Sequence, residues 1–256
     1  MTQESRDLLI KYAAQYETAD FLEGDPSWFM HQVTGVENQE AMAFISSCLS
    51  YGNRQQFMKK TDMILSWSGG KIDQWVRSGD YEQHFRPGDK QCFYRLYNHD
   101  TMYHFLHAYQ QLLQEHGTLG NLLRHQAHDG LSAVGSICRY FSQHGISVVV
   151  PKDTQSACKR VCMFLRWMVR DGSPVDLGLW ADFIDKRTLV VPLDTHVVQE
   201  ACRLGLLKSR AASMSAAKRL TAKLAEVFPD DPCRGDFALF GIGVDCDCGP
   251  DAGGAR

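Results

Sequence analysis

The sequence predicts an all-α fold, and three features of its 256 residues support that prediction. Apolar side chains recur at helical spacing through most of the chain. Residue types that favour helix N-termini stand before several of these stretches, and glycine or proline follows them. Only one short run, 146–150, has the β-branched composition of a strand. This length fits one large domain or two small ones.

The expected helices of the first half follow from their apolar spacing and their end signals. The first is an amphipathic stretch at 8–16, followed by a helix that Asn38 caps and that stops near Tyr51-Gly52. A helix around 57–65 ends before Gly69-Gly70, and a helix capped by Asp100 ends at Gly117. Short helices are expected around 119–125 and 131–141.

The second half has the clearest pattern. Asp153, Thr154 and Ser156 are N-cap types that precede a strongly apolar helix from Ala157 to Met168. A different face of that helix carries Lys159, Met163, Arg166 and Arg170. Later helices are expected from the N-cap Asp194 to Gly205, from about 215 to 228, and from the N-cap Asp236 to Gly241.

Charge is unevenly distributed along the chain. Residues 1–151 hold 12 Lys/Arg and 16 Asp/Glu, residues 152–223 hold 13 and 7, and residues 224–256 hold 2 and 7. The basic central part is compatible with a nucleic-acid-binding face and equally with the solvated sides of helices. The whole-chain net charge of −3 argues against an obligate polyanion binder.

The nine cysteines predict reduced thiols rather than a disulfide framework. Cys158 and Cys162 share a helical face, but no second pair stands near them, so we expect small core residues rather than metal ligands. No apolar run is long enough for a membrane span, and the N-terminus has no secretory pattern. We therefore expect a cytoplasmic protein.

The residues best suited to catalysis are a lysine and an aspartate. Lys159 opens the apolar helix, where partial desolvation would favour the neutral amine and hence a nucleophile. Asp194 stands at a helix N-terminus, where the helix dipole keeps a carboxylate ionised. A fixed anion of this kind suits stabilisation of an oxocarbenium-like sugar cation.

The stretch from Pro192 to Val197, Pro-Leu-Asp-Thr-His-Val, resembles the aspartate motif of the helix-hairpin-helix/GPD superfamily of DNA glycosylases. The segment from Lys159 to Arg170 is similar to the lysine helix of the archaeal 8-oxoguanine DNA glycosylase branch, which has a similarly long lysine-to-aspartate separation. Across residues 20–245 the chain also resembles an uncharacterised bacterial family affiliated to this superfamily. The recurrent short motifs of that family are present here as Leu-Ser-Tyr-Gly-Asn-Arg at 49–54, Phe-Leu-Arg-Trp-Met-Val-Arg at 164–170 and Val-Asp-Leu-Gly-Leu-Trp at 175–180.

The resemblance implies a bifunctional DNA glycosylase and AP lyase that excises a damaged base, and 8-oxoguanine is the base that it favours. It implies a single two-lobed helical domain over residues 1–245, with the site between an N-terminal lobe (about 1–100 plus the C-terminal helices) and a central lobe (about 101–210). Residues 246–256 would form a flexible tail. The partner would be double-stranded DNA with a damaged base, without a membrane or an obligate protein partner.

The resemblance also implies roles for individual residues. Lys159 and Asp194 would be catalytic, and no metal or other cofactor is required, since the endonuclease III cluster is absent. Further roles follow for the base pocket (Met163, Asp236, Phe240 and Asn53) and for DNA binding (Lys152, Arg160 and His196).

Two other functions remain open at this point. One is a non-catalytic module of the same fold that binds DNA structures. The other is a helical metal phosphohydrolase, because His99-Asp100 and His128-Asp129 are doublets with further histidines between them (His104, His107, His116 and His125).

Overall fold

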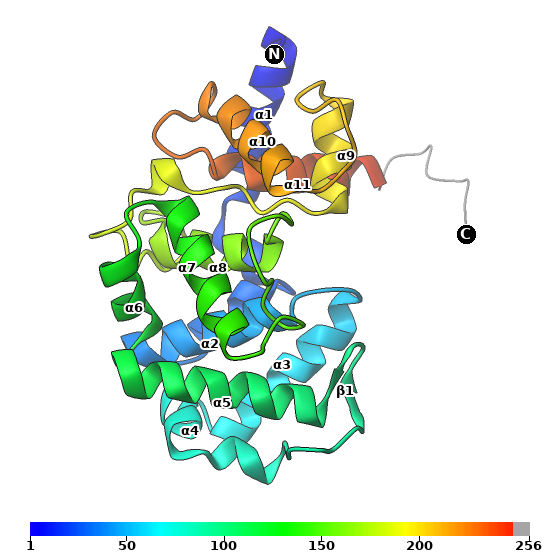
Figure 1. Ribbon diagram of the computed structural model, residues 1–256. Helices are drawn as coiled ribbons and strands as arrows, with labels where there is room; N and C mark the ends of the chain where they lie inside the picture. The colour runs from blue at the N-terminus through cyan, green and yellow to red at the C-terminus, as the bar shows by residue number, and fades with distance from the viewer. Residues whose placement is uncertain (248–256) are drawn as a thin grey trace.

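The computed structural model describes the backbone of residues 1–247 and side chains through residue 245, and its regular structure is mostly helical (Figure 1). The expected all-α class is confirmed. The α-helices are α1 (Gln3–Tyr16), α2 (Val36–Leu49), α3 (Arg54–Ser68), α4 (Ile72–Ser78), α5 (His99–His116), α6 (Leu119–Gln126), α7 (Gly130–Gln143), α8 (Lys159–Val169), α9 (Thr195–Arg203), α10 (Met214–Ala225) and α11 (Arg234–Asp247). Short 3-10 segments are η1 (Ala19–Leu22), η2 (Pro26–His31), η3 (Asp80–Gln83) and η4 (Lys186–Thr188). The tail expected at 246–256 lies outside the described residues from 248 onward, and residues 246 and 247 continue α11.

The strand expected at 146–150 does not form. Val149 and Val150 are buried in a segment of turns instead. The strands of the described chain are β1 (Cys92–Tyr94) and β2 (Tyr97–Asn98), which pair antiparallel about a tight turn where Arg95 has a φ of 51°. A strand needs a partner for its backbone groups, and β-branched composition alone does not supply one.

Several helices begin at a residue other than the expected cap. Asn38 lies inside α2, which starts after Gly35, and its side chain accepts a hydrogen bond from the Asp73 amide at 3.1 Å. Asp100 lies in the first turn of α5, and Asn98 is the cap. Polar side chains are favoured throughout a first turn, so the pattern locates the turn better than the cap residue.

The same correction holds in the second half. Asp236 is the third residue of α11 and not its cap. The cap types at Asp153, Thr154 and Ser156 precede α8 without capping it, since α8 begins after Cys158, whose φ is 47°. Helices α3 and α5 end at the expected glycines, Gly69 and Gly117.

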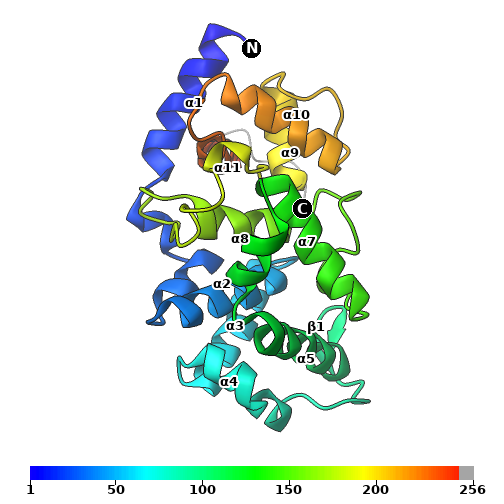
Figure 2. The ribbon, with the colours of Figure 1, turned by 60° about the vertical axis from the view of Figure 1, so that its left-hand side comes forward.

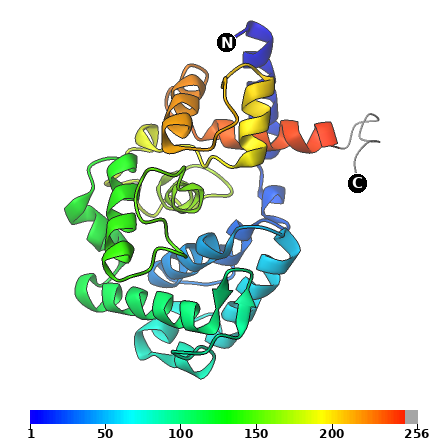
Figure 3. The ribbon, with the colours of Figure 1, turned by 45° about the vertical axis from the view of Figure 1, so that its right-hand side comes forward.

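Helix α2 forms the centre of the core. Every residue from Glu40 to Leu49 is buried, and α2 packs against α8, α3 and α4. Figure 3 shows α9 and α11 above α8, with α2 and α3 below it. Helix α8 therefore joins the upper and lower groups of helices.

Helix α1 packs along α11 at short range (Figure 2). A Cβ atom at Gly241 would lie 2.2 Å from Cδ2 of Tyr16, so only glycine permits this approach. The hydroxyl groups of Tyr12 and Tyr16 donate to Asp245 at 2.9 and 2.6 Å. The N-terminal helix thus supports the C-terminal one.

A buried ionic network also joins α1, α8 and the segment before α11. Arg170 follows α8 directly, is 1% exposed, and donates through Nε to Asp231 at 2.9 and 3.0 Å. Its terminal nitrogens contact Asp176 and Glu17. Taking a guanidinium out of water is costly unless such partners satisfy it.

The cysteines whose side chains are described are all free, and Cys158 and Cys162 are buried in the core as expected. Within residues 1–247, no helix combines the length and the apolar composition that crossing a membrane would require.

Replacement of Arg170 by methionine should lower the free energy of unfolding by about 3–5 kcal/mol, because three buried carboxylates lose their shared cation. Chemical denaturation of the purified variant measures this. Arg187→Met is the matched control, since its pair with Asp185 is exposed and screened by solvent, so the free energy of unfolding should stay close to that of wild type. Equal effects of the two substitutions would contradict the prediction.

Glu40 should make stability depend on pH. It accepts the amide hydrogens of Leu119 and Gly120 at 2.7 and 3.1 Å. Burial raises the pKa of Glu40 from 4.5 to about 7, against the lowering effect of these hydrogen bonds. The folded state therefore binds more protons than the unfolded state between these values, so stability should fall as pH rises from about 4.5 to 7.

Denaturation curves measured at pH 5 and pH 7.5 would test this, and Glu40→Gln should flatten the difference between them. Glu37→Gln, at an exposed position on the same helix, should keep the wild-type difference. A Glu40→Gln variant with an unchanged difference would assign the pH dependence to other groups.

Candidate active site

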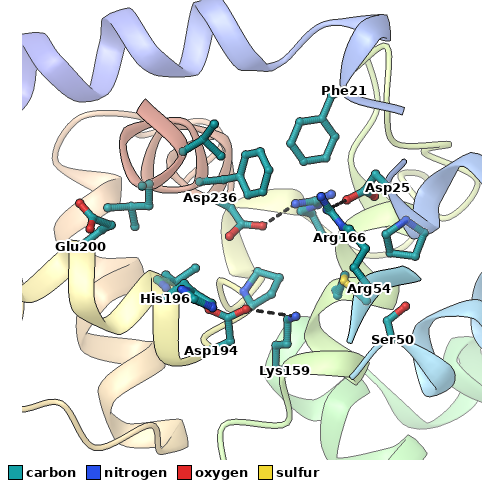
Figure 4. A pocket seen from close by; sticks show the side chains of 18 of the residues that line it. Phe21, Asp25, Ser50, Arg54, Lys159, Arg166, Asp194, His196, Glu200 and Asp236 are labelled. Carbon is teal, nitrogen blue, oxygen red and sulfur yellow. Dashed lines mark hydrogen bonds and ion pairs between the residues drawn. The ribbon is translucent and has the colours of Figure 1, made fainter. Parts of the chain in front are cut away.

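A pocket with a volume of about 390 Å³ lies where α8, α9 and α11 approach the connection between α2 and α3 (Figure 4). Its wall combines apolar and aromatic side chains with a small number of charged groups. Pockets of this size and composition are typical of small-molecule and base-binding sites.

Lys159 and Asp194 form an ion pair in this pocket. Lys159 is the first residue of α8 and Asp194 caps α9, and their Nζ and Oδ2 atoms lie 3.2 Å apart. The side chains are 34% and 32% exposed, so solvent and a substrate can reach both. The fold thus brings two residues that are 35 positions apart in the sequence into direct contact.

Asp194 is held by its cap geometry, as its sequence context predicts. Its backbone is extended, after the buried Pro192 and Leu193, and its Oδ1 accepts the amide hydrogen of Val197 at 2.9 Å. Burial raises the pKa of Asp194, but the Lys159 ammonium and the Val197 amide outweigh burial and lower the pKa below 3.8. Asp194 is therefore a carboxylate at neutral pH.

Asp236 lines the opposite side of the pocket and pairs with Arg166. Asp236 is 8% exposed, and the Arg166 guanidinium donates to its Oδ2. Arg166 also donates to Asp176 at 3.3 Å, so it is anchored from both sides. Burial raises the pKa of Asp236, while Arg166 acts in the opposite direction.

The apolar part of the pocket includes Met163 and Phe240. Met163 is 8% exposed, and the Phe240 ring meets the Phe21 ring edge-on with 5.1 Å between centroids. The Arg54 guanidinium lies 5.7 Å from the Phe240 centroid and pairs with Asp25 at 3.0 Å. Aromatic and thioether groups provide surfaces on which a flat ligand can stack.

The structure brings most of the expected site residues together. The pocket is lined by six of them: Lys159, Met163, Asp194, His196, Asp236 and Phe240. His196 is exposed in the first turn of α9.

The other three expected residues lie elsewhere. Asn53 caps α3 by accepting the Gln56 amide hydrogen at 3.1 Å, and the neighbouring Gly52 and Arg54 line the pocket in its place. Lys152 is exposed and outside the pocket lining.

Arg160 is engaged with the protein. Its guanidinium donates to the Cys48 carbonyl at 2.7 Å and to the Tyr97 hydroxyl, and it lies over the Tyr51 ring. It therefore stabilises the α2–α8 contact, which does not favour the phosphate-binding role expected for it.

Sequence reasoning missed Phe21, Asp25, Arg54 and Arg166 as pocket residues. For Arg166 a signal was present, because it shares a helical face with Lys159 and Met163. Phe21 and Asp25 come from segments that carry no such pattern, whereas Arg54 adjoins Asn53, which the resemblance placed in the pocket.

The histidine doublets do not gather into a metal site. Among the residues that the structure describes, no group of three or more His, Cys, Asp or Glu side chains has metal-binding geometry. His99 lies 2.8 Å from the His84 carbonyl through Nδ1, and Asp100 pairs with Lys90. These contacts are those of helix ends and not of a ligand cluster.

Comparison with protein families matches the chain to a family of unknown function. No curated protein and no solved structure matches this chain. Residues 25–245 match the family described as "Protein of unknown function (DUF2400)", which covers most of the 256 residues. The chain therefore belongs to the DUF2400 family.

Proposed function

We propose that the protein is a DNA repair glycosylase with AP-lyase activity, and that its substrate base is 8-oxoguanine. The observation that carries the proposal is the contact between Lys159 and Asp194 inside a pocket that also holds Met163, Phe240 and Asp236. An amine and a fixed carboxylate at one point are the groups needed to break an N-glycosidic bond and to capture the sugar. In this proposal the helices on either side of the pocket are the two lobes that hold the DNA.

The pocket is proposed to bind a nucleotide that has been flipped out of the duplex. Met163 and Phe240 would hold the two faces of the base. Asp236, oriented by Arg166, would accept a hydrogen bond from the base edge. 8-Oxoguanine carries a hydrogen on N7 where guanine carries only a lone pair, so a carboxylate acceptor at this edge favours the damaged base.

Lys159 is proposed to act as the nucleophile. Its ammonium first gives a proton to solvent, which reaches the side chain because it is 34% exposed, so Asp194 stays a carboxylate at 3.2 Å from Nζ. The Nζ–C1′ bond then forms while the bond from C1′ to the base breaks, and the base leaves with the electron pair and takes up a proton. The Asp194 carboxylate stabilises the positive charge that develops on the sugar.

The lyase step would follow from the same intermediate. Breaking of the C1′–O4′ bond, with a proton added to O4′, converts the amine adduct into a Schiff base. Loss of a proton from C2′ then expels the 3′ phosphate by β-elimination and nicks the strand. The groups of this proposal all belong to the chain or the DNA.

The first test is borohydride trapping on a duplex with a single 8-oxoguanine. Wild-type protein should form a covalent adduct because reduction fixes the Schiff base, and Lys159→Gln should form none. Lys71→Gln, an exposed position outside the pocket, should trap like wild type.

Absence of an adduct with 8-oxoguanine, abasic and uracil duplexes would reject the lyase activity. Retained DNA binding by Lys159→Gln together with no adduct from wild type would favour a non-catalytic DNA-binding module.

Asp236 should matter for base excision more than for strand cleavage. Asp236→Asn should lower excision of 8-oxoguanine by roughly 10- to 100-fold, the effect expected from one hydrogen bond to a charged group. Cleavage of a preformed abasic duplex should stay near the wild-type rate, because no base is then present. Single-turnover kinetics on the two substrates measure the difference.

Equal losses on both substrates would contradict a role in base recognition. A thermal melt of the variant separates that outcome from unfolding, since Asp236 also pairs with buried Arg166.

A further inference from the structure

A surface beside the pocket carries positive charge that the protein does not neutralise. Between Glu200 and Glu226 the chain has six Lys or Arg residues and no Asp or Glu. Lys208 and Arg210, in the connection between α9 and α10, are exposed. Within the described residues, no carboxylate forms an ion pair with either of them.

This segment is held next to the start of α8. Ser213, which caps α10, forms an antiparallel bridge with Ser156, three residues before Lys159. Figure 3 shows the connection that leaves α9 and returns to the beginning of α10. Lys152, also exposed and without an ion pair among the described residues, lies in the segment that contains Ser156. These three exposed cations belong to the two segments that the bridge joins, and we call them the basic strip (Lys152, Lys208 and Arg210).

The cations inside the pocket contrast with the basic strip. Lys159 pairs with Asp194, Arg166 with Asp236, and Arg54 with Asp25. Each Lys or Arg side chain of the pocket is thus paired with a carboxylate, whereas the unpaired positive charge lies outside the pocket. Unpaired cations grouped beside a pocket favour a ligand that is anionic outside the part held in the pocket.

We propose that the basic strip binds backbone phosphates of DNA next to the nucleotide held in the pocket. This inference rests on the proposed function, because that function is the reason for choosing DNA among the polyanions that such a strip could bind. Because contacts to phosphates carry no sequence information, the strip would contribute affinity and register but no sequence preference. It would not take part in the chemical step.

The test compares two double variants that lose the same charge. Lys208→Ala/Arg210→Ala removes two cations of the strip. Lys71→Ala/Arg86→Ala removes two exposed cations near α4 and η3, which are remote from α9 and α10 (Figure 1). Fluorescence anisotropy measures binding to an undamaged duplex and to a duplex with a tetrahydrofuran abasic analogue, each over a range of salt concentrations.

The strip variant should weaken binding to both duplexes by roughly 10-fold or more at low salt, and should reduce the slope of log K against log salt by about 2. The control variant should keep the wild-type slope. At saturating DNA, the strip variant should trap by borohydride at the wild-type rate, because Lys159 is intact.

Strip and control variants with the same slope would overturn the inference while leaving the proposed lyase open. Conversely, a strip-dependent slope without any trapped adduct would support the strip and reject the proposed chemistry. Wild-type protein that binds neither duplex, or that binds a poly-glutamate peptide as tightly as DNA, would reject DNA as the ligand of the strip.

Discussion

Two buried guanidinium groups, one on α8 and one directly after it, determine where the walls of the pocket stand. Arg166 and Arg170 are 4% and 1% exposed, and both donate to Asp176. Arg166 also donates a hydrogen bond to Asp236 on α11. Arg170 also donates to Asp231 and to Glu17, which directly follows α1. Buried cations tolerate little displacement from their partners, because each lost contact leaves an unpaired charge. The network therefore fixes the position of α11 relative to α8, and with it the distance between the Asp236 and Lys159 sides of the pocket.

Helix α8 has two faces with separate tasks. Its apolar face fills the core through Phe164, Leu165 and Met168, each at most 1% exposed. The opposite face presents Lys159 and Met163 to the pocket and then Arg166 to the network. The nucleophile proposed here and the residues that hold its surroundings in place are therefore carried by one rigid element, an arrangement that favours a preorganised site.

The amino-acid pattern predicted the helical class and the two catalytic candidates, Lys159 and Asp194, because these depend on local rules, whereas the other expected pocket residues followed from the family resemblance. Apolar spacing located α8, cap chemistry identified Asp194, and the two coincide with the ion pair in the structure. The pattern could not reveal Phe21 or the Arg54–Asp25 pair, because their approach to Phe240 depends on how α1 packs along α11. It also placed the strand wrongly, since pairing of β1 with β2 rests on a turn at Arg95 and not on composition.

Two carboxylates in the same pocket have pKa values displaced in opposite directions. Burial raises the pKa of both carboxyl groups. Lys159 and the Val197 amide at the α9 N-terminus reverse this effect on the pKa of Asp194, whereas the pKa of Asp236 stays raised. Such divergence is characteristic of sites where neighbouring acids have different tasks. Asp194, held firmly as an anion, suits stabilisation of a developing cation. Asp236, with its higher proton affinity, is the stronger hydrogen-bond acceptor and suits recognition of a donor on the ligand. Because Arg166 orients Asp236 and the α9 N-terminus orients Asp194, the two tasks can be altered independently by substitutions on different helices.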